Sequence, residues 1–329
     1  MQKEIIQKIV AASGITADEL VLVHFWGEDA DIEIMHHFAD AVASLGASPV
    51  EMQQSRTVNA KRFTELVGTT FNDKYFERLS NFDAVLDIFC YQPVVLGTKL
   101  DDEKMMLYKN YMGRLFGAVS KAKRMTQIRI PSSENASEAN MSHDEFAKRM
   151  YSAYDVDYNA LKAVCEAKIS EMKSKGELAL LTGTNCRLDF DLTGRKWYID
   201  AGDGDMPCGE VYIAPIEAKT NGTVFFKTLY AGDWGNFENV TLTIKGGVVV
   251  NADNALLDGH FEKLDAKSKT ICELGFGLNP SITSLCGYTV LDEKACGTFH
   301  IAIGANTMFG GTNDAQLHMD FVGHYNKVM

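Results

Sequence analysis

The chain has 329 residues and a mass of 36.4 kDa, with 46% hydrophobic and 23% charged residues. This composition is typical of a folded protein with a sizeable core and excludes a disordered chain. The formal charge of −12 argues against nucleic acid or an anionic membrane as a partner, and it is compatible with a small substrate or a metal ion. The amino terminus has no leader-like apolar segment, and no apolar run approaches the ~20 residues of a membrane span, so we expect a cytoplasmic protein.

The first 142 residues alternate between apolar runs of strand length and segments with helical spacing. Strands are predicted at 19–25, 49–53, 84–89 and 124–130, and helices near 29–46, 73–79 and 101–120. This alternation predicts an N-terminal α/β domain, 1–142, with a parallel sheet covered by helices. The loop at 26–30 lacks GxGxxG and the chain lacks a P-loop motif, so no nucleotide cofactor is expected.

The remaining chain changes character twice. A long helical pattern runs from His143 to Lys175 and is followed by Gly176, which predicts a bridging helix over 143–176. From Glu177 onward, short strand-like segments are separated by glycines, which predicts a β-rich domain over 177–329. The fold class is therefore α/β, with an N-terminal parallel α/β domain and a β-rich C-terminal metal-binding domain.

The cysteines do not form a disulfide framework. They are seven in number, scattered and without a CxxC pair: Cys90, Cys165, Cys186, Cys208, Cys272, Cys286 and Cys296. We expect reduced, mostly buried thiols. Cys208 and Cys272 each lie close in sequence to a candidate metal ligand.

The C-terminal domain contains side chains that suit a divalent metal. In the extended segment His318-Met319-Asp320, the imidazole and the carboxylate point to the same side. Glu273 lies in an apolar, glycine-rich segment, where a carboxylate is costly without a cation. The candidate ligands are Glu210, Glu273, His300, His318 and Asp320.

His300 belongs to a segment with strict alternation. Phe299, Ile301 and Ile303 point to one face, which leaves His300 on the opposite face. Alone, this histidine is compatible with a core residue bonded to a backbone carbonyl. Together with His318 and Asp320 it favours a metal site. Two imidazoles and three carboxylates can hold one or two ions such as Zn, Mn, Co or Fe.

The order of these motifs resembles the aminopeptidase T / AmpS family of metallopeptidases. The similarity rests on Gly-Glu-Val-Tyr, Glu-Leu-Gly-Phe-Gly, Asp-Glu-Lys-Ala-Cys-Gly-Thr-Phe-His-Ile-Ala-Ile-Gly and His-Met-Asp, and it is strongest over about 180–323. The upstream Gly194-Arg195 is similar to the family as well. The resemblance implies two divalent ions held by the five candidate ligands, removal of N-terminal residues from peptides, and a homodimer.

One position departs from that family. Its members place a tyrosine seven residues after the motif histidine, as a ligand or as a donor to the transition state, and this chain has Thr307 there. A threonine hydroxyl is shorter and less acidic than a phenol, so it does not replace that group. Thr307 is therefore the catalytic position at which the aminopeptidase interpretation is weakest.

Two other function classes remain open. The dihydroxypyridine ring-cleaving dioxygenases of the same superfamily use one iron held by two histidines and an aspartate, a composition that His300, His318 and Asp320 share. A ring-opening enzyme, either such an Fe(II) dioxygenase or a C–C hydrolase of a cyclic diketone, is thus a close alternative. Glu210 and Glu273 favour a redox-inert or Mn-type site instead. A non-catalytic metal-binding protein is the third class.

On the hydrolytic interpretation, the protein is a divalent-metal-dependent hydrolase acting on a small-molecule or short-peptide carbonyl. The metal activates a water molecule, and a carboxylate must then carry the proton. Glu273 is the first candidate for this base, and Glu293 is the second. Trp26, His24 and Tyr91 of the first domain are interpreted as ordinary core residues.

Overall fold

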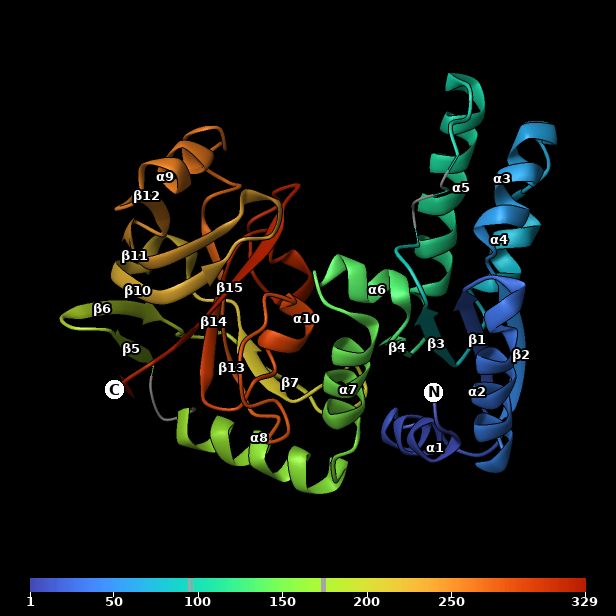
Figure 1. The fold of residues 1–329 in the computed structure, drawn as a ribbon, viewed down its shortest axis with the longest axis horizontal. Helices are drawn as coiled ribbons and strands as arrows, with labels where there is room; N and C mark the ends of the chain where they lie inside the picture. Colours follow the sequence, from blue (N-terminus) through green and yellow to red (C-terminus); the bar gives the residue numbers. More distant parts are fainter. Residues whose placement is uncertain (94–95, 97, 173–175) are drawn as a thin grey trace. The chain divides into compact units, whose positions relative to one another are not determined.

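The computed structural model describes residues 1–93, 96, 98–172 and 176–329, and the chain forms two compact units (Figure 1). The N-terminal unit contains 1–155 and 202–207, and the C-terminal unit contains 156–201 and 208–329. Among the described helices, none has both the length and the apolar composition needed to cross a bilayer.

The N-terminal unit is built on a parallel sheet in the order β2-β1-β3-β4-β8. The strands are β1 (Leu20–Trp26), β2 (Ser48–Gln53), β3 (Ala84–Phe89), β4 (Arg124–Arg129) and β8 (Asp205–Met206). Strand β3 is buried along its whole length, and β1 is buried apart from its first residue. Such continuous apolar runs are expected where helices cover both faces of a parallel sheet. The prediction of an α/β fold with a parallel sheet in the N-terminal part of the chain is confirmed.

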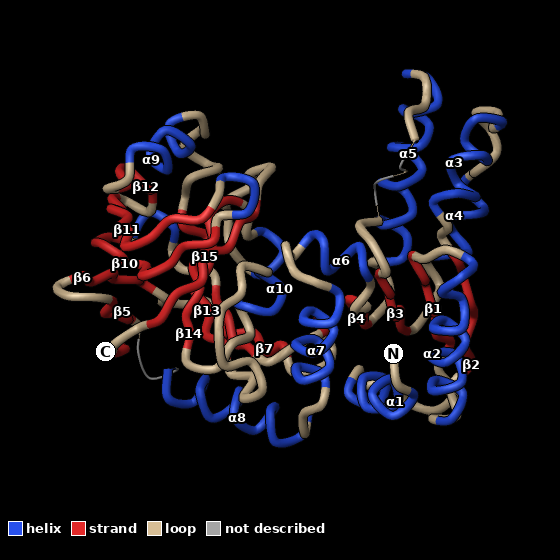
Figure 2. The backbone as a smooth tube through the Cα atoms, viewed as in Figure 1, coloured by secondary structure: helices blue, strands red, loops and turns tan. Residues whose placement is uncertain are grey.

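The helices of this unit follow its strands in the sequence and lie beside the sheet (Figure 2). They are α1 (Lys3–Ala12), η1 (Asp29–Asp31), α2 (Ile32–Ser44), α3 (Arg56–Glu65), α4 (Asp73–Leu79), α5 (Asp102–Val119), α6 (Ser133–Glu138) and α7 (His143–Tyr154). The sequence pattern predicted α2, α4 and α5 closely but not α1 or α3. In α3, Asn59 and Phe63 are the buried residues, so its apolar stripe is too narrow to be recognised from spacing.

The stretch from His143 to Lys175 is not one helix, and the prediction of a continuous bridging helix is wrong in this respect. It forms α7 in the N-terminal unit and α8 (Tyr158–Met172) in the C-terminal unit, and 173–175 lie outside the described residues. Between the helices, Asp157 Oδ1 accepts hydrogen bonds from the backbone N–H groups of Asn159 and Ala160, both at 3.0 Å. Asp157 therefore starts a new helix as an N-terminal cap.

The C-terminal unit contains two antiparallel sheets. The first, in spatial order, is β12 (Val248–Ala252), β11 (Asn236–Lys245), β10 (Asn221–Tyr230), β6 (Cys186–Asp191), β5 (Glu177–Thr182) and β16 (Lys327–Val328). The second is β15 (His318–His324), β14 (Thr298–Gly304), β13 (Ile271–Gly277), β9 (Glu210–Ile213) and β7 (Trp197–Asp200). The expected β-rich C-terminal half is confirmed.

The two sheets share one hydrophobic core. Phe226 of β10 packs against Phe299 of β14, with ring centroids 5.5 Å apart, and against Phe321 of β15, at 6.5 Å. Helix α8 packs on β7 and β9. The remaining elements are η2 (Glu217–Lys219), η3 (Gly232–Trp234), α9 (Ala255–Glu262), α10 (Thr289–Asp292) and η4 (Thr307–Phe309). One face of the second sheet is therefore occupied by core, and its other face is available for a site.

Candidate metal centre

The candidate ligands lie on one face of the five-stranded sheet because strand side chains alternate. Strand β14 pairs with β13 on one side and β15 on the other, with Ala302 opposite both Glu273 and Asp320. His300, two residues before Ala302, points to the same side, as does His318, two residues before Asp320. Phe299, Ile301 and Ile303 are in the hydrophobic core on the opposite face, as predicted.

Small residues between the ligands give them room. Gly275 lies opposite His300 in the pairing of β13 with β14. A Cβ atom on Gly275 would lie 2.0 Å from Nε2 of His300, which is far inside van der Waals contact. The imidazole therefore occupies the space above Gly275, and any larger residue there would displace it.

The five candidate ligands form a continuous cluster. Nε2 of His300 lies 3.3 Å from Glu273 Oε1 and 3.5 Å from Glu210 Oε2. Nε2 of His318 lies 3.5 Å from both Glu273 Oε2 and Asp320 Oδ2. Glu273, His300 and Asp320 each offer one ligand atom within 4.8 Å of the others. Residues that span 110 positions in the sequence thus converge on one small region.

The tautomer of His318 is fixed by its surroundings. Its Nδ1 lies 2.8 Å from the backbone oxygen of Ala305, and because a carbonyl only accepts, Nδ1 must carry the proton. Nε2 then presents a lone pair toward Glu273 and Asp320 unless the ring is fully protonated. A backbone carbonyl that orients an imidazole in this way is a common support of metal-ligating histidines.

The spacing fits a metal ion. Donor atoms about 2.1 Å from a common ion at tetrahedral angles lie about 3.4 Å from one another. The separations of 3.3 and 3.5 Å between the imidazole nitrogens and the carboxylate oxygens match this value. Glu210 Oε2 is also buried, and among the described residues it has no hydrogen-bond partner, which leaves it able to accept a cation. The residues present therefore fit a divalent metal.

The pKa values of His300 and His318 are raised, which shows that the cluster favours positive charge. Burial lowers the pKa of His300, but the hydrogen bond to Glu273 and the charges of the neighbouring carboxylates outweigh it and raise the pKa to about 9. Burial likewise lowers the pKa of His318, and the contacts with Asp320 and Cys272 raise it to about 12. Burial raises the pKa of Glu273. The cluster binds protons tightly because it is rich in negative charge and poor in solvent.

A second group of charges adjoins the first. Lys294 follows α10, its side chain is 1% exposed, and its Nζ lies 2.9 Å from Glu293 Oε1 and 3.6 Å from Asp200 Oδ2. The same ammonium forms a short ion pair with Glu210 Oε1. Burial raises the pKa of Glu293 to about 8. The predicted catalytic carboxyl of Glu293 is thus close to the cluster, on the side of Glu210.

The loop that contains Thr307 is held from outside the sheet. Glu217 accepts hydrogen bonds from the backbone N–H of Thr312 at 2.7 Å and from Asn306 Nδ2 at 3.0 Å. Arg195 binds both Glu217, at 2.7 Å, and the backbone oxygen of Gly310. Thr307 itself is exposed at the start of η4. Within the described part of the chain, no hydrogen bond or ion pair joins Thr307 to the candidate ligands.

Lys294 and Asp200 also belong to this region, although they were not predicted from the sequence. Asp200 ends β7 directly opposite Glu210 on β9, so the alternation of Trp-Tyr-Ile-Asp was a usable signal for its face. Lys294 lies in a turn without periodicity, and its sequence suggested an exposed partner of Glu293. Cys272, noted beside Glu273, places its Sγ 3.7 Å from His318 Nδ1, and burial raises the pKa of this thiol to about 11.

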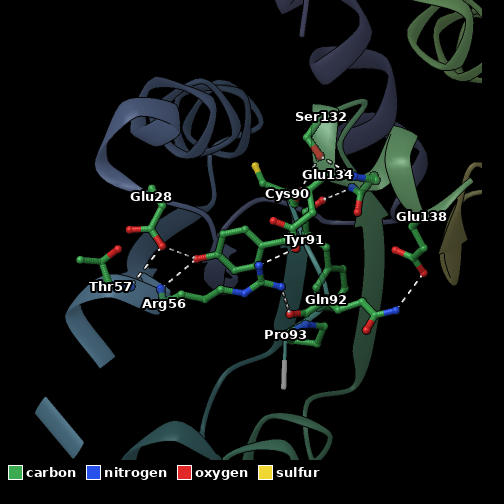
Figure 3. A network of polar contacts seen from close by, with 12 residues as sticks. Glu28, Arg56, Thr57, Cys90, Tyr91, Gln92, Pro93, Ser132, Glu134 and Glu138 are labelled. Carbon is green, nitrogen blue, oxygen red and sulfur yellow. Dashed lines mark hydrogen bonds and ion pairs between the residues drawn. The ribbon is translucent and has the colours of Figure 1, made fainter. Parts of the chain in front are cut away.

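The N-terminal unit has a separate polar cluster at the carboxyl ends of its parallel strands (Figure 3). Arg56 stacks on the ring of Tyr91 at 3.8 Å and pairs with Glu134. The Tyr91 hydroxyl donates to Glu28 Oε1 at 3.1 Å, and the same carboxylate accepts from Thr57 N at 3.2 Å. These residues line a cavity of about 820 Å³. His24 and Trp26 are buried as expected for core, whereas Tyr91 is buried but also lines this cavity.

The chain matches one protein family in sequence and several solved structures in fold. A family model described as thermophilic metalloprotease (M29) matches residues 9–327. No curated protein sequence matches the chain. Among solved structures, the fold is similar to wild-type AmpT from Thermus thermophilus, with a TM-score of 0.69, 16% identity, and coverage of 99% of this chain and 94% of that chain. It is also similar to 2,5-dihydroxypyridine dioxygenase from Pseudomonas putida KT2440, with a TM-score of 0.65, 13% identity, and coverage of 98% and 91%.

Proposed function

The chain belongs to the M29 family of metalloproteases, and from this membership we propose that it is a divalent-metal-dependent hydrolase that removes the N-terminal residue from short peptides. The observation that carries the proposal is the convergence of two imidazole nitrogens and three carboxylates on one sheet face. Glu210, Glu273, His300, His318 and Asp320 are proposed as the ligands, with Mn, Zn or Co as the metal. A homodimer is part of the proposal because the resemblance implies one, and the cytoplasmic location stays a prediction from the sequence.

The metal would supply a water of lowered pKa and polarise the substrate carbonyl. Both oxygens of Glu273 face imidazole nitrogens, so its role is better described as a ligand that orients the others. Glu293 is then the proposed proton carrier. Its pKa of about 8 leaves a useful fraction of the carboxyl in each protonation state near neutral pH, and Lys294 at 2.9 Å holds it in place.

Aromatic side chains adjoin the ligands. Phe309 meets the ring of His318 edge-on at 6.1 Å, and Tyr212 packs against Phe309 at 5.5 Å. Burial raises the pKa of Tyr212, so its phenol remains protonated. These rings form an apolar wall beside His318, and electrostatic interactions are stronger next to a surface of low polarity.

The direct test combines metal analysis with hydrolysis of a leucyl arylamide. Protein purified without added metal is treated with a chelator, reloaded with Mn, Zn or Co, and assayed. We expect no cleavage by the metal-free protein and cleavage after reloading. A metal-loaded, folded protein that cleaves neither this substrate nor a series of dipeptides would contradict the aminopeptidase proposal.

A ring-opening reaction is the second candidate, because the tyrosine of the family is replaced by Thr307, which is exposed. The similarity in fold to a dioxygenase is compatible with it. On this proposal His300, His318 and Asp320 would hold Fe(II), or another ion for hydrolysis of a cyclic diketone. The assay is ring cleavage with and without oxygen. Oxygen dependence would identify a dioxygenase, and turnover without oxygen would identify a hydrolase.

A further inference from the structure

Lys294 is buried among carboxylates, which is an unusual place for an ammonium group. Its side chain is 1% exposed, and its Nζ contacts Glu210, Glu293 and Asp200. A lysine is rarely fully buried unless it is paired, and here a single ammonium faces three potential negative charges. Burying an ammonium group costs solvation free energy. The negative charge of the surrounding carboxylates must therefore offset that cost for Lys294.

The pairing of two strands brings these negative charges together. Asp200 on β7 and Glu210 on β9 are direct partners in register, so two carboxylates face one another on the same side of the sheet. Like charges directly opposite each other destabilise a strand pair. A cation between them offsets this repulsion, and the Nζ of Lys294 lies 3.6 Å from the Asp200 carboxylate and contacts that of Glu210.

Glu210 links the lysine to the candidate metal ligands. One oxygen, Oε1, contacts Lys294, and the other, Oε2, lies 3.5 Å from His300 Nε2. In sites with two metals, the ions lie about 3.5–4 Å apart. In such a site, one carboxylate can bridge the two ions by giving one oxygen to each. Glu210 has the same arrangement, because each of its oxygens faces a different cation position.

We propose that the ammonium of Lys294 occupies the second cation position, so that this protein holds one divalent ion per chain among Glu210 Oε2, Glu273, His300, His318 and Asp320. Asp200, Glu210 and Glu293 would be the ligands of a second ion, and they are already paired with Lys294. The inference rests on the proposed function, because it concerns the metal count of the same site. It distinguishes this chain from a dinuclear hydrolase.

The first test is the stoichiometry of the wild-type protein. Metal-free protein is titrated with Mn(II), and bound manganese is counted by mass spectrometry after removal of free ion. We expect one Mn(II) per chain, together with the six-line electron paramagnetic resonance signal of an isolated ion. Two ions per chain, or a signal split by coupling between neighbouring ions, would overturn the inference.

The second test removes the ammonium. Lys294→Ala leaves three carboxylates around an empty space, and we expect the count to rise from one to two Mn(II) per chain, with a coupled signal. Lys267→Ala, which removes an exposed lysine paired with Asp314 in the same unit, should remain at one. A folded Lys294→Ala protein that still binds one ion would contradict the proposal.

The outcomes separate the count from the proposed function. A wild-type protein that binds two ions and cleaves arylamides would keep the hydrolase proposal and reject the role of Lys294. A wild-type protein that binds no ion would reject both. If Lys294→Ala does not fold, the wild-type count and its spectrum still decide the inference.

Discussion

The backbone oxygen of Ala305 lies 2.8 Å from Nδ1 of His318, and this contact determines which nitrogen of the ring can bind a metal. Ala305 follows β14 and His318 begins β15, so the contact joins the two strands at the end of their pairing. The orientation of the ligand is therefore established by the backbone of the neighbouring strand and exists before any ion binds.

The first prediction concerns His318. His318→Ala removes Nε2 from the cluster, and we expect the affinity for Mn(II) or Zn(II) to fall by roughly 100-fold or more. Loss of a residue that only supports a ligand lowers metal affinity by about 10–100-fold, and loss of the ligand itself should lower it further. Titration calorimetry on the metal-free protein measures this change. His324→Ala, an exposed histidine on the same strand, is the matched control and should bind metal as the wild type does. Equal affinity in both variants would remove His318 from the ligand set.

The second prediction concerns the space above Gly275. Gly275→Ala places a Cβ 2.0 Å from the position of His300 Nε2, so the imidazole must move and metal affinity should fall by at least about 10-fold. Gly259→Ala in α9, where a Cβ would meet no described atom within 4 Å beyond its own helix backbone and chain neighbours, should bind metal normally and be more stable by about 0.5–1 kcal/mol. Metal titration and thermal unfolding measure both effects. Unchanged affinity in Gly275→Ala would show that His300 does not need its observed position.

The third prediction separates the two carboxyls considered for proton transfer. We expect Glu293→Gln to retain its metal while kcat falls by roughly 10²–10⁴-fold, because an amide cannot carry the proton. Glu273→Gln should instead lose metal, since both of its oxygens face imidazoles. Metal content and steady-state kinetics are measured on the same preparations. If Glu273→Gln kept its metal but lost turnover, the base would be Glu273.

The fourth prediction is a pH dependence of stability at Glu217. Burial by itself raises the pKa of this carboxyl, but hydrogen bonds from Thr312 and Asn306 and the charge of Arg195 lower it below its usual value of 4.5. A lowered pKa in the folded state stabilises the protein above the unfolded pKa, and this stabilisation is lost as the pH falls through the folded pKa. Glu217→Gln should therefore cost roughly 1–3 kcal/mol at pH 7 and much less near pH 3.

Urea unfolding at the two pH values measures that difference. Glu262→Gln, an exposed glutamate on α9, serves as the control and should change stability little at either pH. A cost of Glu217→Gln that stays constant from pH 7 to pH 3 would show that the ionised carboxylate is not the stabilising form.

Several features of this protein were accessible from the sequence because they depend on local periodicity. The alternation of Phe299, Ile301 and Ile303 with His300 predicted the two faces of β14, and the structure confirms it. The strand at 84–89 and the helix at 73–79 were recognised with their bounds, since each is a compact pattern between turn residues. Local spacing is sufficient to predict the face on which a side chain lies when that face depends only on the periodicity of its own strand or helix.

Other features depend on contacts between distant segments. Lys294 joins the site only because its turn lies over the ends of β7 and β9, which no local pattern indicates. The division of 143–172 into two helices depends on the cap at Asp157, a weak signal within an otherwise helical pattern. The strand β8 was not predicted, because two residues, Asp205 and Met206, are too short a segment for periodicity.

That short strand has a consequence for the order in which the protein can fold. Residues 202–207 complete the N-terminal unit, although the chain has by then already entered the C-terminal unit at residue 156. Tyr154 hydrogen-bonds the backbone oxygen of Met206 at 2.9 Å, so α7 also depends on this late segment. During synthesis, the first unit gains its last strand only after residues 156–201 of the second unit have been translated. A truncated chain ending at 155 would lack β8 and leave the edge of β4 unpaired. Such an edge can pair with a strand of another chain and cause aggregation.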